Sequence, residues 1–301
     1  DLWRTGALAP TRESMPDAAQ SVRDSIGNDI PFEVIDTKEW AGHHAVAERF
    51  QDGRVFIAGD AAHLLWPSGG FGMNTAMGDA VDLGWKLAAT LHGWGGPGLL
   101  ESYDLERRPI GERNVSGAAD IRAADDRLPM SDILDDDTEE AEALRGRLGK
   151  FIEESQRGQE FRTRLPGLEM GYSYDGSPLI VPDGSDAVPN TPVTYVPSAR
   201  PGNRAPHAWL ADGRSTLDLF GRGCTLLRFG EAAVPSLSRS RVPLEVVDVD
   251  EPHIADLYQR RLVLVRPDGH VAWRGDELPA DVLDRAAGYK SPSPAAAGEV
   301  K

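Results

Sequence analysis

The stretch RVFIAGDAAHLLWPSGGFGMNTAMGDAVDLGWK, residues 54–86, decides the fold. Its first six residues are almost wholly apolar and predict a short strand that is buried on both faces. The run stops at Gly-Asp, and a loop of Pro, Ser and Gly then leads into a helix that begins on further glycines. A structural turn needs one or two glycines. This stretch has Gly59, Gly69, Gly70, Gly72 and Gly78.

That backbone freedom favours a ligand lying against the main chain. In α/β sheets, ligands sit at the carboxyl ends of the strands, where Asp60 follows the run 54–59. The loop 64–72 then delivers the chain to a helix N-terminus, which offers free N–H groups and a partial positive charge. Asp60 offers a carboxylate to hydroxyl groups. We therefore expect a ligand that has a polyol and an electron-rich planar edge.

The bulk composition narrows the class of protein. The chain has 301 residues, enough for roughly two domains, and a formal net charge of -16. This charge argues against nucleic acid and against an anionic membrane surface as partners. The one cysteine, Cys224, excludes an intrachain disulfide and a cysteine-based metal framework, and we expect no metal site. No apolar run reaches 18 residues and no signal peptide is recognised, so we expect a cytoplasmic protein.

Periodicity predicts the helices of the first half. Apolar spacing predicts a helix over 12–26 that is capped by Thr11, and β-branched and aromatic residues predict a strand over 31–40. From Met73 a stripe of apolar and small residues recurs at helical spacing as far as Leu91. The loop GWGGPG, residues 93–98, ends this helix. A second long helix is predicted from about residue 99 to 127, followed by a charged, solvated helix within 135–151.

The C-terminal part alternates strands and helices after a Pro-, Gly- and Ser-rich segment. Strands are predicted over 215–220, 225–229 and 244–250, helices over 252–259 and 277–287, and a hairpin over 262–273. The triplet Pro-Asp-Gly supplies the turn of this hairpin.

The sequence GRVFIAGDAAHLLWPSGGFGMNTAMGDAVDLGWKLA, followed by GPGLLESYDLERRP, resembles the second FAD-binding segment of the class A flavoprotein aromatic hydroxylases. The resemblance is to the p-hydroxybenzoate and phenol hydroxylase group, especially its polyketide hydroxylase branch. It covers about 60 residues strongly. The C-terminal 90 residues also look like the thioredoxin-like extension of the phenol hydroxylase branch.

The resemblance implies a mixed α/β (α+β) fold in five parts. Residues 1–50 would end a substrate-binding domain and supply part of its sheet. Residues 51–165 would be the C-terminal part of a Rossmann-like FAD-binding domain with long helices. A linker over 166–205, a thioredoxin-like domain over 206–290 and a disordered tail over 291–301 would follow.

The resemblance also implies roles for individual residues. In the family, the Gly-Asp aspartate bonds the ribityl chain, the Pro-containing loop passes beside the isoalloxazine, and the helix-start N–H groups bind the flavin O2 and N1 edge. The cofactor-binding residues implied here are Gly59, Asp60, Pro67, Gly70, Gly72, Met73 and Asn74. Ser68 and Gly69 accompany Pro67 in its loop. Pro67 and His44 are the candidate catalytic residues, and His44 or its neighbour His43 would aid a phenol proton.

The family's strand–GxGxxG–helix segment is absent from this chain. One formal match, Gly93, Gly95 and Gly98, follows a helix instead of a strand and contains Pro97, so we interpret it as an interhelix loop. The middle Asp-Gly motif, associated with pyrophosphate and NAD(P)H, is absent too. We therefore expect the chain to be a fragment whose partner is the missing N-terminal portion of the same enzyme.

The function implied is that of an FAD- and NAD(P)H-dependent monooxygenase. It would use O2 to form a flavin C4a-hydroperoxide that hydroxylates a phenolic or polyketide ring. A helix N-terminus at residues 72–74 would stabilise negative charge on the reduced flavin. A Baeyer–Villiger type oxygen insertion on the same scaffold is an alternative.

Two alternatives concern the C-terminal region. One is a non-catalytic interaction module of thioredoxin-like fold, and the other is a thiol-redox protein. The region has no Cys-x-x-Cys, and Cys224 has no partner in the chain, which excludes dithiol redox chemistry. We expect Cys224 to be a buried apolar residue and the region to be structural, with subunit contact in a homodimer as one role.

Overall fold

The computed structural model of the chain describes residues 4–6, 11–27, 30–125, 131–157, 165–189, 191–235 and 240–289. It contains two compact units, residues 1–42 and residues 43–301. The predicted tail over 291–301 lies outside the described residues.

The first unit holds one α-helix, α1 (Ala18–Ile26), after a 3-10 turn over Arg12–Ser14. The side chain of Asp17 caps α1 by accepting from the backbone N–H of Gln20. The prediction of one helix capped by Thr11 is therefore wrong. Pro16 explains the difference, because a proline disfavours helical backbone in the residue before it.

The predicted strand over 31–40 is not formed. Residues 31–40 are irregular, and Ile35 and Trp40 are 76% and 64% exposed. A strand needs a neighbouring strand to pair with. Across residues 4–6, 11–27 and 30–42 of this unit, the chain offers no such partner.

The second unit begins with two short antiparallel strand pairs, β1 (Ala45–Val46) with β4 (His63–Leu64) and β2 (Gln51–Asp52) with β3 (Val55–Phe56). The predicted strand over 54–59 is thus reduced to β3. Val55 is 67% exposed, so the prediction of burial on both faces is wrong. The physical reason is that β3 has one strand neighbour among the described residues, β2, where a doubly buried strand needs two.

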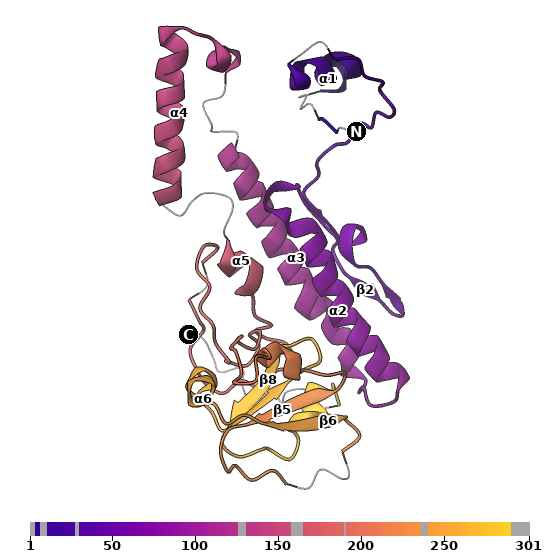
Figure 1. The fold of residues 1–301 in the computed structure, drawn as a ribbon. Coiled ribbons are helices and arrows are strands. Elements are labelled where there is room, and N and C mark those ends of the chain that lie inside the picture. The colour runs from indigo at the N-terminus through magenta and orange to yellow at the C-terminus, as the bar shows by residue number, and fades with distance from the viewer. Residues whose placement is uncertain are drawn as a thin grey trace, which may run out of the picture. The chain divides into compact units, whose positions relative to one another are not determined.

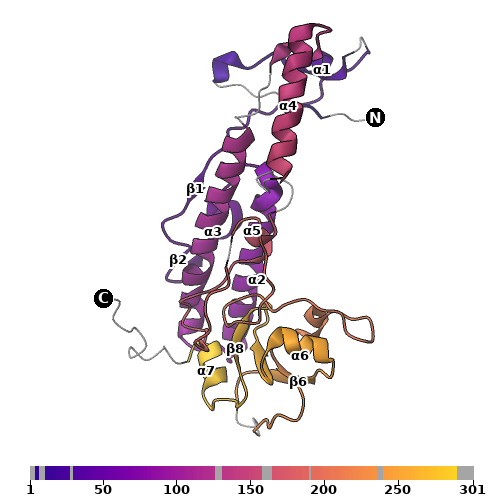
Figure 2. The same ribbon diagram turned by 90° about the vertical axis from the view of Figure 1, so that its left-hand side faces the viewer.

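Two long helices, α2 (Phe71–Leu91) and α3 (Gly98–Asp125), lie side by side (Figures 1 and 2). The loop between them holds the GWGGPG sequence, so the prediction of an interhelix loop is confirmed. Its glycines allow close packing. A Cβ atom on Gly96 would lie 2.5 Å from the backbone of Gly288, near the end of the described chain.

Helix α2 buries its polar face. Its buried residues include Asp79, Asp82 and Lys86, whereas the predicted apolar stripe faces outward. Met73 and Met77 on that stripe are 72% and 59% exposed. The burial of charged groups is possible because the facing helix α3 supplies partners for them, such as Glu106 for Lys86 and Arg107 for Asp79.

Between α3 and the C-terminal sheet, the described residues form two α-helices and a long irregular segment. The helices are α4 (Glu139–Arg157), preceded by a 3-10 turn over Asp132–Asp135, and α5 (Pro166–Met170). As predicted, α4 is charged, and most of its described side chains are exposed. The irregular segment that follows α5 buries Tyr174, Leu179 and Ile180.

The C-terminal part is a four-stranded sheet of order β6-β5-β7-β8. Its strands are β5 (Cys224–Arg228), β6 (Leu244–Asp248), β7 (Leu262–Val265) and β8 (Val271–Gly275). β5 pairs with β6 in parallel, and the pairs β5–β7 and β7–β8 are antiparallel. Each face of the sheet packs in its own apolar cluster, because successive residues of a strand point to opposite faces. One cluster contains Leu226 and Leu264, and the other contains Leu227 and Val263.

Most C-terminal predictions are confirmed. The hairpin turns at Gly269, whose φ is +78°, and helix α6 (Pro252–Tyr258) lies where it was predicted. Helix α7 (Val282–Ala286) is shorter than predicted. The predicted strand over 215–220 is instead a 3-10 turn, Thr216–Leu219. It forms because Ser215 and Asp218 make a capping box.

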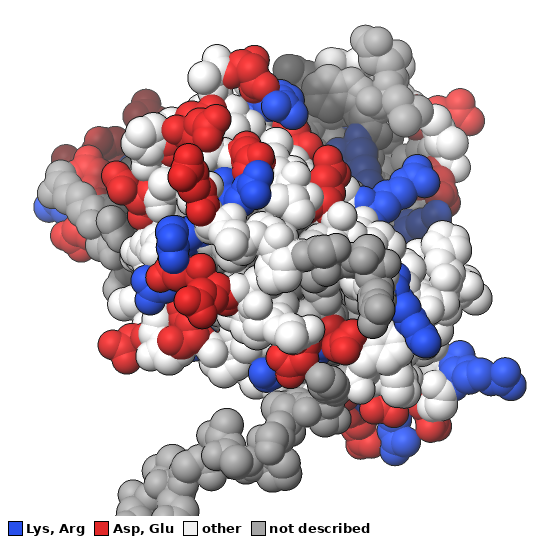
Figure 3. All heavy atoms as spheres, turned by 90° about the horizontal axis from the view of Figure 1, so that it is seen from below, with Lys and Arg blue, Asp and Glu red and all other residues white. Residues whose placement is uncertain are grey.

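The surface of the second unit carries charges of both signs. On the face shown in Figure 3, Asp and Glu side chains are interspersed with Lys and Arg, and the described residues of that face form no continuous basic patch. Within the described residues, none of the helices has the length and apolar character that a bilayer span requires.

Candidate functional site

The Gly59-Asp60 pair lies in a 3-10 turn, Gly59–Ala61, that packs on helix α2. Gly59 has a φ of +58°, and a Cβ atom there would lie 3.1 Å from the Cβ of Ala76 on α2. Its backbone N–H donates to Asp79 Oδ2 at 3.0 Å. Both the backbone conformation and the close approach therefore require glycine. Asp60, next in the chain, is exposed.

The Pro67 loop leads directly into α2. Pro67 precedes a 3-10 turn, Ser68–Gly70, in which Gly69 and Gly70 have φ values of +76° and +72°. Helix α2 begins at Phe71, and its N-cap Gly70 makes no side-chain capping bond. The amides without an intrahelical acceptor are therefore those at the first positions, up to Met73.

The predicted residues of this region fit an FAD molecule. Cβ atoms built on Gly70 and Gly72 would meet nothing within 4 Å, so a planar ring can approach the backbone where the uncapped amides lie. The side chain of Asn74 donates to the carbonyl of Gly70 at 2.9 Å and fixes the turn. Within the described residues, the Asp60 carboxylate has no hydrogen-bond partner and is available to hydroxyl groups.

His44 lies beside the Pro67 loop. The β1–β4 pairing, with Ala45 opposite Leu64, sets this register. The rings of His44 and Trp66 meet edge to face, with their centroids 5.9 Å apart. The structure therefore places His44 against Trp66, the residue before Pro67, although the two candidate catalytic residues, His44 and Pro67, are 23 positions apart in the sequence. The guanidinium of Arg122 on α3 also lies over the Trp66 ring, 5.3 Å from its centroid.

Asp79 is the hydrogen-bonding centre that sequence reasoning missed. It is fully buried and accepts at Oδ2 from Gly59 N–H, pairs there with His63 Nε2 at 2.7 Å, and accepts at Oδ1 from Arg107 Nε at 2.9 Å. Burial acts to raise the pKa of Asp79, but the His63 hydrogen bond and the Arg107 charge outweigh it and hold the pKa below its usual value. His63 thus has a local structural role.

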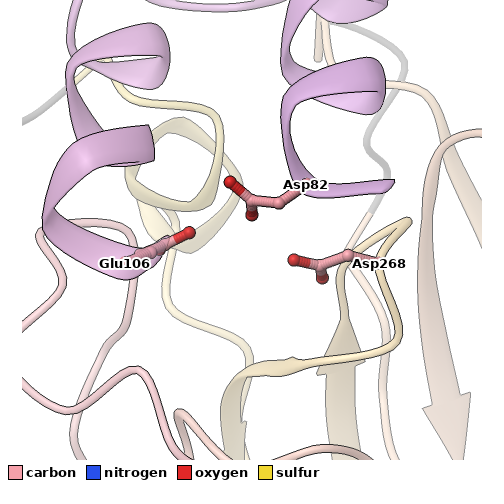
Figure 4. A group of neighbouring side chains, drawn as sticks. All are labelled: Asp82, Glu106 and Asp268. Atoms are coloured by element: carbon pink, nitrogen blue, oxygen red, sulfur yellow. The ribbon is translucent and has the colours of Figure 1, made fainter. Parts of the chain in front are cut away.

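A second buried cluster joins the helices to the C-terminal sheet. In Figure 4, Asp82 and Glu106 project from two neighbouring helices toward Asp268, which lies in the turn of the β7–β8 hairpin. Arg266 donates to Glu106 Oε1 at 2.6 Å and to Asp82 Oδ1 at 3.2 Å. Lys86 donates to Asp82 at 2.7 Å and to Glu106 at 2.6 Å. The sheet is therefore held to α2 and α3 by ion pairs.

The electrostatics of this cluster favour an ion-pair clamp over a metal site. The three carboxyl groups offer oxygen atoms within 4.8 Å of one another, but Lys86 and Arg266 already bond these oxygens. Burial acts to raise the pKa of Glu106, yet the charges of Arg266 and Lys86 outweigh it and lower that pKa. Burial, offset only in part by Lys86, raises the pKa of Asp82 to about 8.

Two family models match the chain. Residues 4–118 match the FAD binding domain, and residues 198–289 match the aromatic-ring hydroxylase C-terminal domain. The first match contains the Gly59 turn, the Pro67 loop and the start of α2. The second contains the four-stranded sheet.

Relatives and solved structures agree with these matches. The FAD-dependent monooxygenase apdD of Emericella nidulans is 35% identical over 86% of this chain and 45% of its own length. A putative polyketide hydroxylase of Streptomyces halstedii is 33% identical over 93% of this chain and 51% of its own. A structure of RebC with bound 7-carboxy-K252c is 45% identical, with a TM-score of 0.82 over 92% of this chain and 53% of that one.

These matches place the chain in the class of the FAD-dependent aromatic hydroxylases. The chain belongs to the FAD-dependent aromatic-ring hydroxylase family, with its polyketide and phenol hydroxylases, so the resemblance seen in the sequence is confirmed. The chain spans about half the length of the curated relatives it matches.

Proposed function

We propose that the complete protein is an FAD- and NAD(P)H-dependent monooxygenase that hydroxylates a phenolic or polyketide-like aromatic ring. The observation that carries the proposal is the packing of the Gly59-Asp60 turn on α2, a helix whose first amides have no side-chain cap. Relatives named aklavinone 12-hydroxylase and phenol 2-monooxygenase support the substrate class. When bound, FAD supplies the redox chemistry that activates O2 for transfer to the ring.

The residues of this chain bind and orient the reactants. Asp60 would accept hydrogen bonds from the ribityl hydroxyls. The amides at Gly72 and Met73, with the partial positive charge of the α2 N-terminus, would hold the electron-rich edge of the flavin ring and stabilise negative charge there. Pro67 would border the ring, and His44 would accept or return a proton of a substrate phenol.

We also propose that the rest of the complete protein covers the exposed apolar face of α2. Met73, Met77 and Val81 recur at four-residue spacing on this face, and Val81 is 54% exposed. A helix that buries charged residues on one side and exposes apolar ones on the other is typical of a helix between two layers. The half of the relatives' length that this chain does not span would supply the second layer.

The C-terminal sheet would be a thioredoxin-like domain in a structural role. The support is its sheet order, with one parallel pair and then an antiparallel hairpin and a final helix. Cys224 is buried in β5, and burial raises the pKa of its thiol to about 12. An unreactive thiol fits a structural domain better than a redox one.

The test is to produce the complete protein and follow flavin binding and turnover. We expect a flavin absorbance spectrum, NAD(P)H oxidation that a polycyclic phenol stimulates, and a product with one added oxygen atom by mass spectrometry. Asp60→Ala should weaken FAD binding, and Asp52→Ala, an exposed aspartate in β2, should not. A complete protein that stays colourless with FAD, or that consumes NAD(P)H without an oxygenated product, would contradict the proposal.

A further inference from the structure

We propose that Asp79 is the positioning residue that holds the flavin-facing turn Gly59-Asp60 against α2, and that Arg107 and Tyr174 hold Asp79 in place. The inference rests on the proposed function for what the turn faces, but its contacts are those of this chain. Tyr174 comes from the segment after α5, so the site for the flavin depends on a part of the chain far from it in sequence.

The first step is the bond from the turn to the helix. The N–H of Gly59 is buried and donates to Asp79 Oδ2. His63 bonds the same oxygen, and His63 begins β4, which the chain enters directly after the turn. One carboxylate oxygen therefore fixes the turn at both of its ends. Loss of that acceptor leaves a buried N–H group unsatisfied, which a folded protein avoids by moving the backbone.

The second step is the support of Asp79 by Arg107 on α3. Arg107 is 1% exposed. Its Nε donates to Asp79 Oδ1, its Nη2 to the carbonyl of Thr75 at 3.2 Å, and its Nη1 to the hydroxyl of Tyr174 at 3.1 Å. A guanidinium with three directed bonds has one orientation, so the carboxylate that it pairs has one orientation as well.

The third step links this centre to the C-terminal sheet. The ring of Tyr174 lies 4.2 Å from that of His270, centroid to centroid. The guanidinium of Arg266 lies over the same Tyr174 ring at 5.1 Å. Both His270 and Arg266 flank the β7–β8 turn. The packing of the sheet against α2 and α3 therefore fixes Tyr174, and through it Arg107 and Asp79.

Gly78 offers a way to disturb this centre without removing any hydrogen-bonding group. A Cβ atom on Gly78 would lie 2.7 Å from Arg107 Nη2 and 3.2 Å from its Cζ. Gly78→Ala must therefore displace a buried guanidinium that has three partners. Gly149 is the matched control, because it also lies inside a helix, α4, and a Cβ atom there meets nothing within 4 Å.

The experiment uses three variants: Gly78→Ala, the double variant Asp79→Leu with Arg107→Met, and the control Gly149→Ala. The double substitution removes both charges together, so no buried charge is left unpaired and the fold is retained. The first readout is hydrogen exchange at the Gly59 amide, which needs no flavin. The second is the dissociation constant for FAD in the complete protein, with the absorbance spectrum of the bound flavin.

We expect the double variant to exchange the Gly59 amide about tenfold faster and to bind FAD about tenfold more weakly, because the Gly59 amide loses its one buried hydrogen bond. Gly78→Ala should change both quantities in the same direction, and Gly149→Ala should change neither. Folded variants with unchanged exchange and unchanged FAD affinity would overturn the inference. If the unsubstituted complete protein binds no FAD, the proposed function fails instead, and the exchange rates still decide whether Asp79 holds the turn.

Discussion

Asp82→Asn tests which carboxyl group of the buried cluster keeps a proton at neutral pH. Three carboxyl groups face two cations, so one negative charge is in excess. Glu106 accepts from both cations and from Ser177, whereas the longer of the two bonds to Asp82 measures 3.2 Å. Burial raises the pKa of Asp82 to about 8. At pH 7 the substitution therefore replaces a neutral acid with a neutral amide of the same shape.

The effect of pH on stability follows from proton binding. In the unfolded chain Asp82 loses its proton near its ordinary pKa of 3.8, and in the folded chain it keeps the proton up to about 8. Between these values the folded state binds more protons. The stability that this group contributes is therefore fully present below the lower value and is lost as pH rises. One pH unit corresponds to about 1.4 kcal/mol, which makes the loss about 2.6 kcal/mol between pH 5 and pH 7.

An asparagine does not titrate, so Asp82→Asn should gain about 2.6 kcal/mol relative to the wild type between pH 5 and pH 7. Urea unfolding at both pH values measures this difference. Tryptophan fluorescence is a suitable signal, because the Trp85 ring lies within 5.9 Å of Lys86 Nζ and 5.2 Å of the Arg266 guanidinium.

Two results would refute this reasoning. If the difference in stability between the two proteins does not change between pH 5 and pH 7, Asp82 is ionised in the folded chain at both values and the proton lies elsewhere in the cluster. If the variant loses stability relative to the wild type as pH rises, folding lowers the pKa of Asp82 instead of raising it.

Four further predictions test other features. Glu106→Gln should lower the free energy of unfolding at pH 7 by about 3–5 kcal/mol, because it breaks a buried ion pair, and urea titration measures this. Met77→Glu on α2 should reduce the FAD retained by the complete protein, measured by absorbance, whereas Val246→Glu on β6 should not. Gly269→Ala should lower stability in thermal unfolding by about 1–2 kcal/mol, because its φ is positive. Cys224 should react with a thiol reagent only after unfolding, and reaction in the native chain would contradict its burial.

The sequence predicted correctly those elements that depend on residues close together in the chain. The α2–α3 pair with its loop, the hairpin with its turn at Gly269 and helix α6 depend on periodicity and turn residues that are a few positions apart. The prediction of a doubly buried strand over 54–59 was wrong because it concerned contacts with distant parts of the chain. Whether a strand extends and is buried depends on its neighbours, which no local pattern specifies.

The residues of the candidate site likewise fall into two groups, those that lie in one continuous motif and those that are far apart in the sequence. Asp60, Pro67 and the start of α2 form one continuous motif, so the resemblance could supply them together. Asp79 and its partner Arg107 are 28 positions apart, and Arg266 and Asp82 are 184 positions apart. Nothing in the sequence pairs such residues. The available signal was the presence of charged residues at 79, 82 and 86 within an otherwise apolar helix, which a solvated face would also explain.

Helix α2 shows why amphipathic spacing can assign the wrong face to the core. The rule places the apolar stripe inward because burying charge is costly. Here the charges of α2 meet opposite charges from α3 and from the β7–β8 hairpin, which offsets that cost. The apolar stripe is then left for a different partner. The sequence of α2 therefore fits two neighbours, one for each side of the helix. Among the described residues, α3 and the β7–β8 hairpin form the neighbour on the charged side.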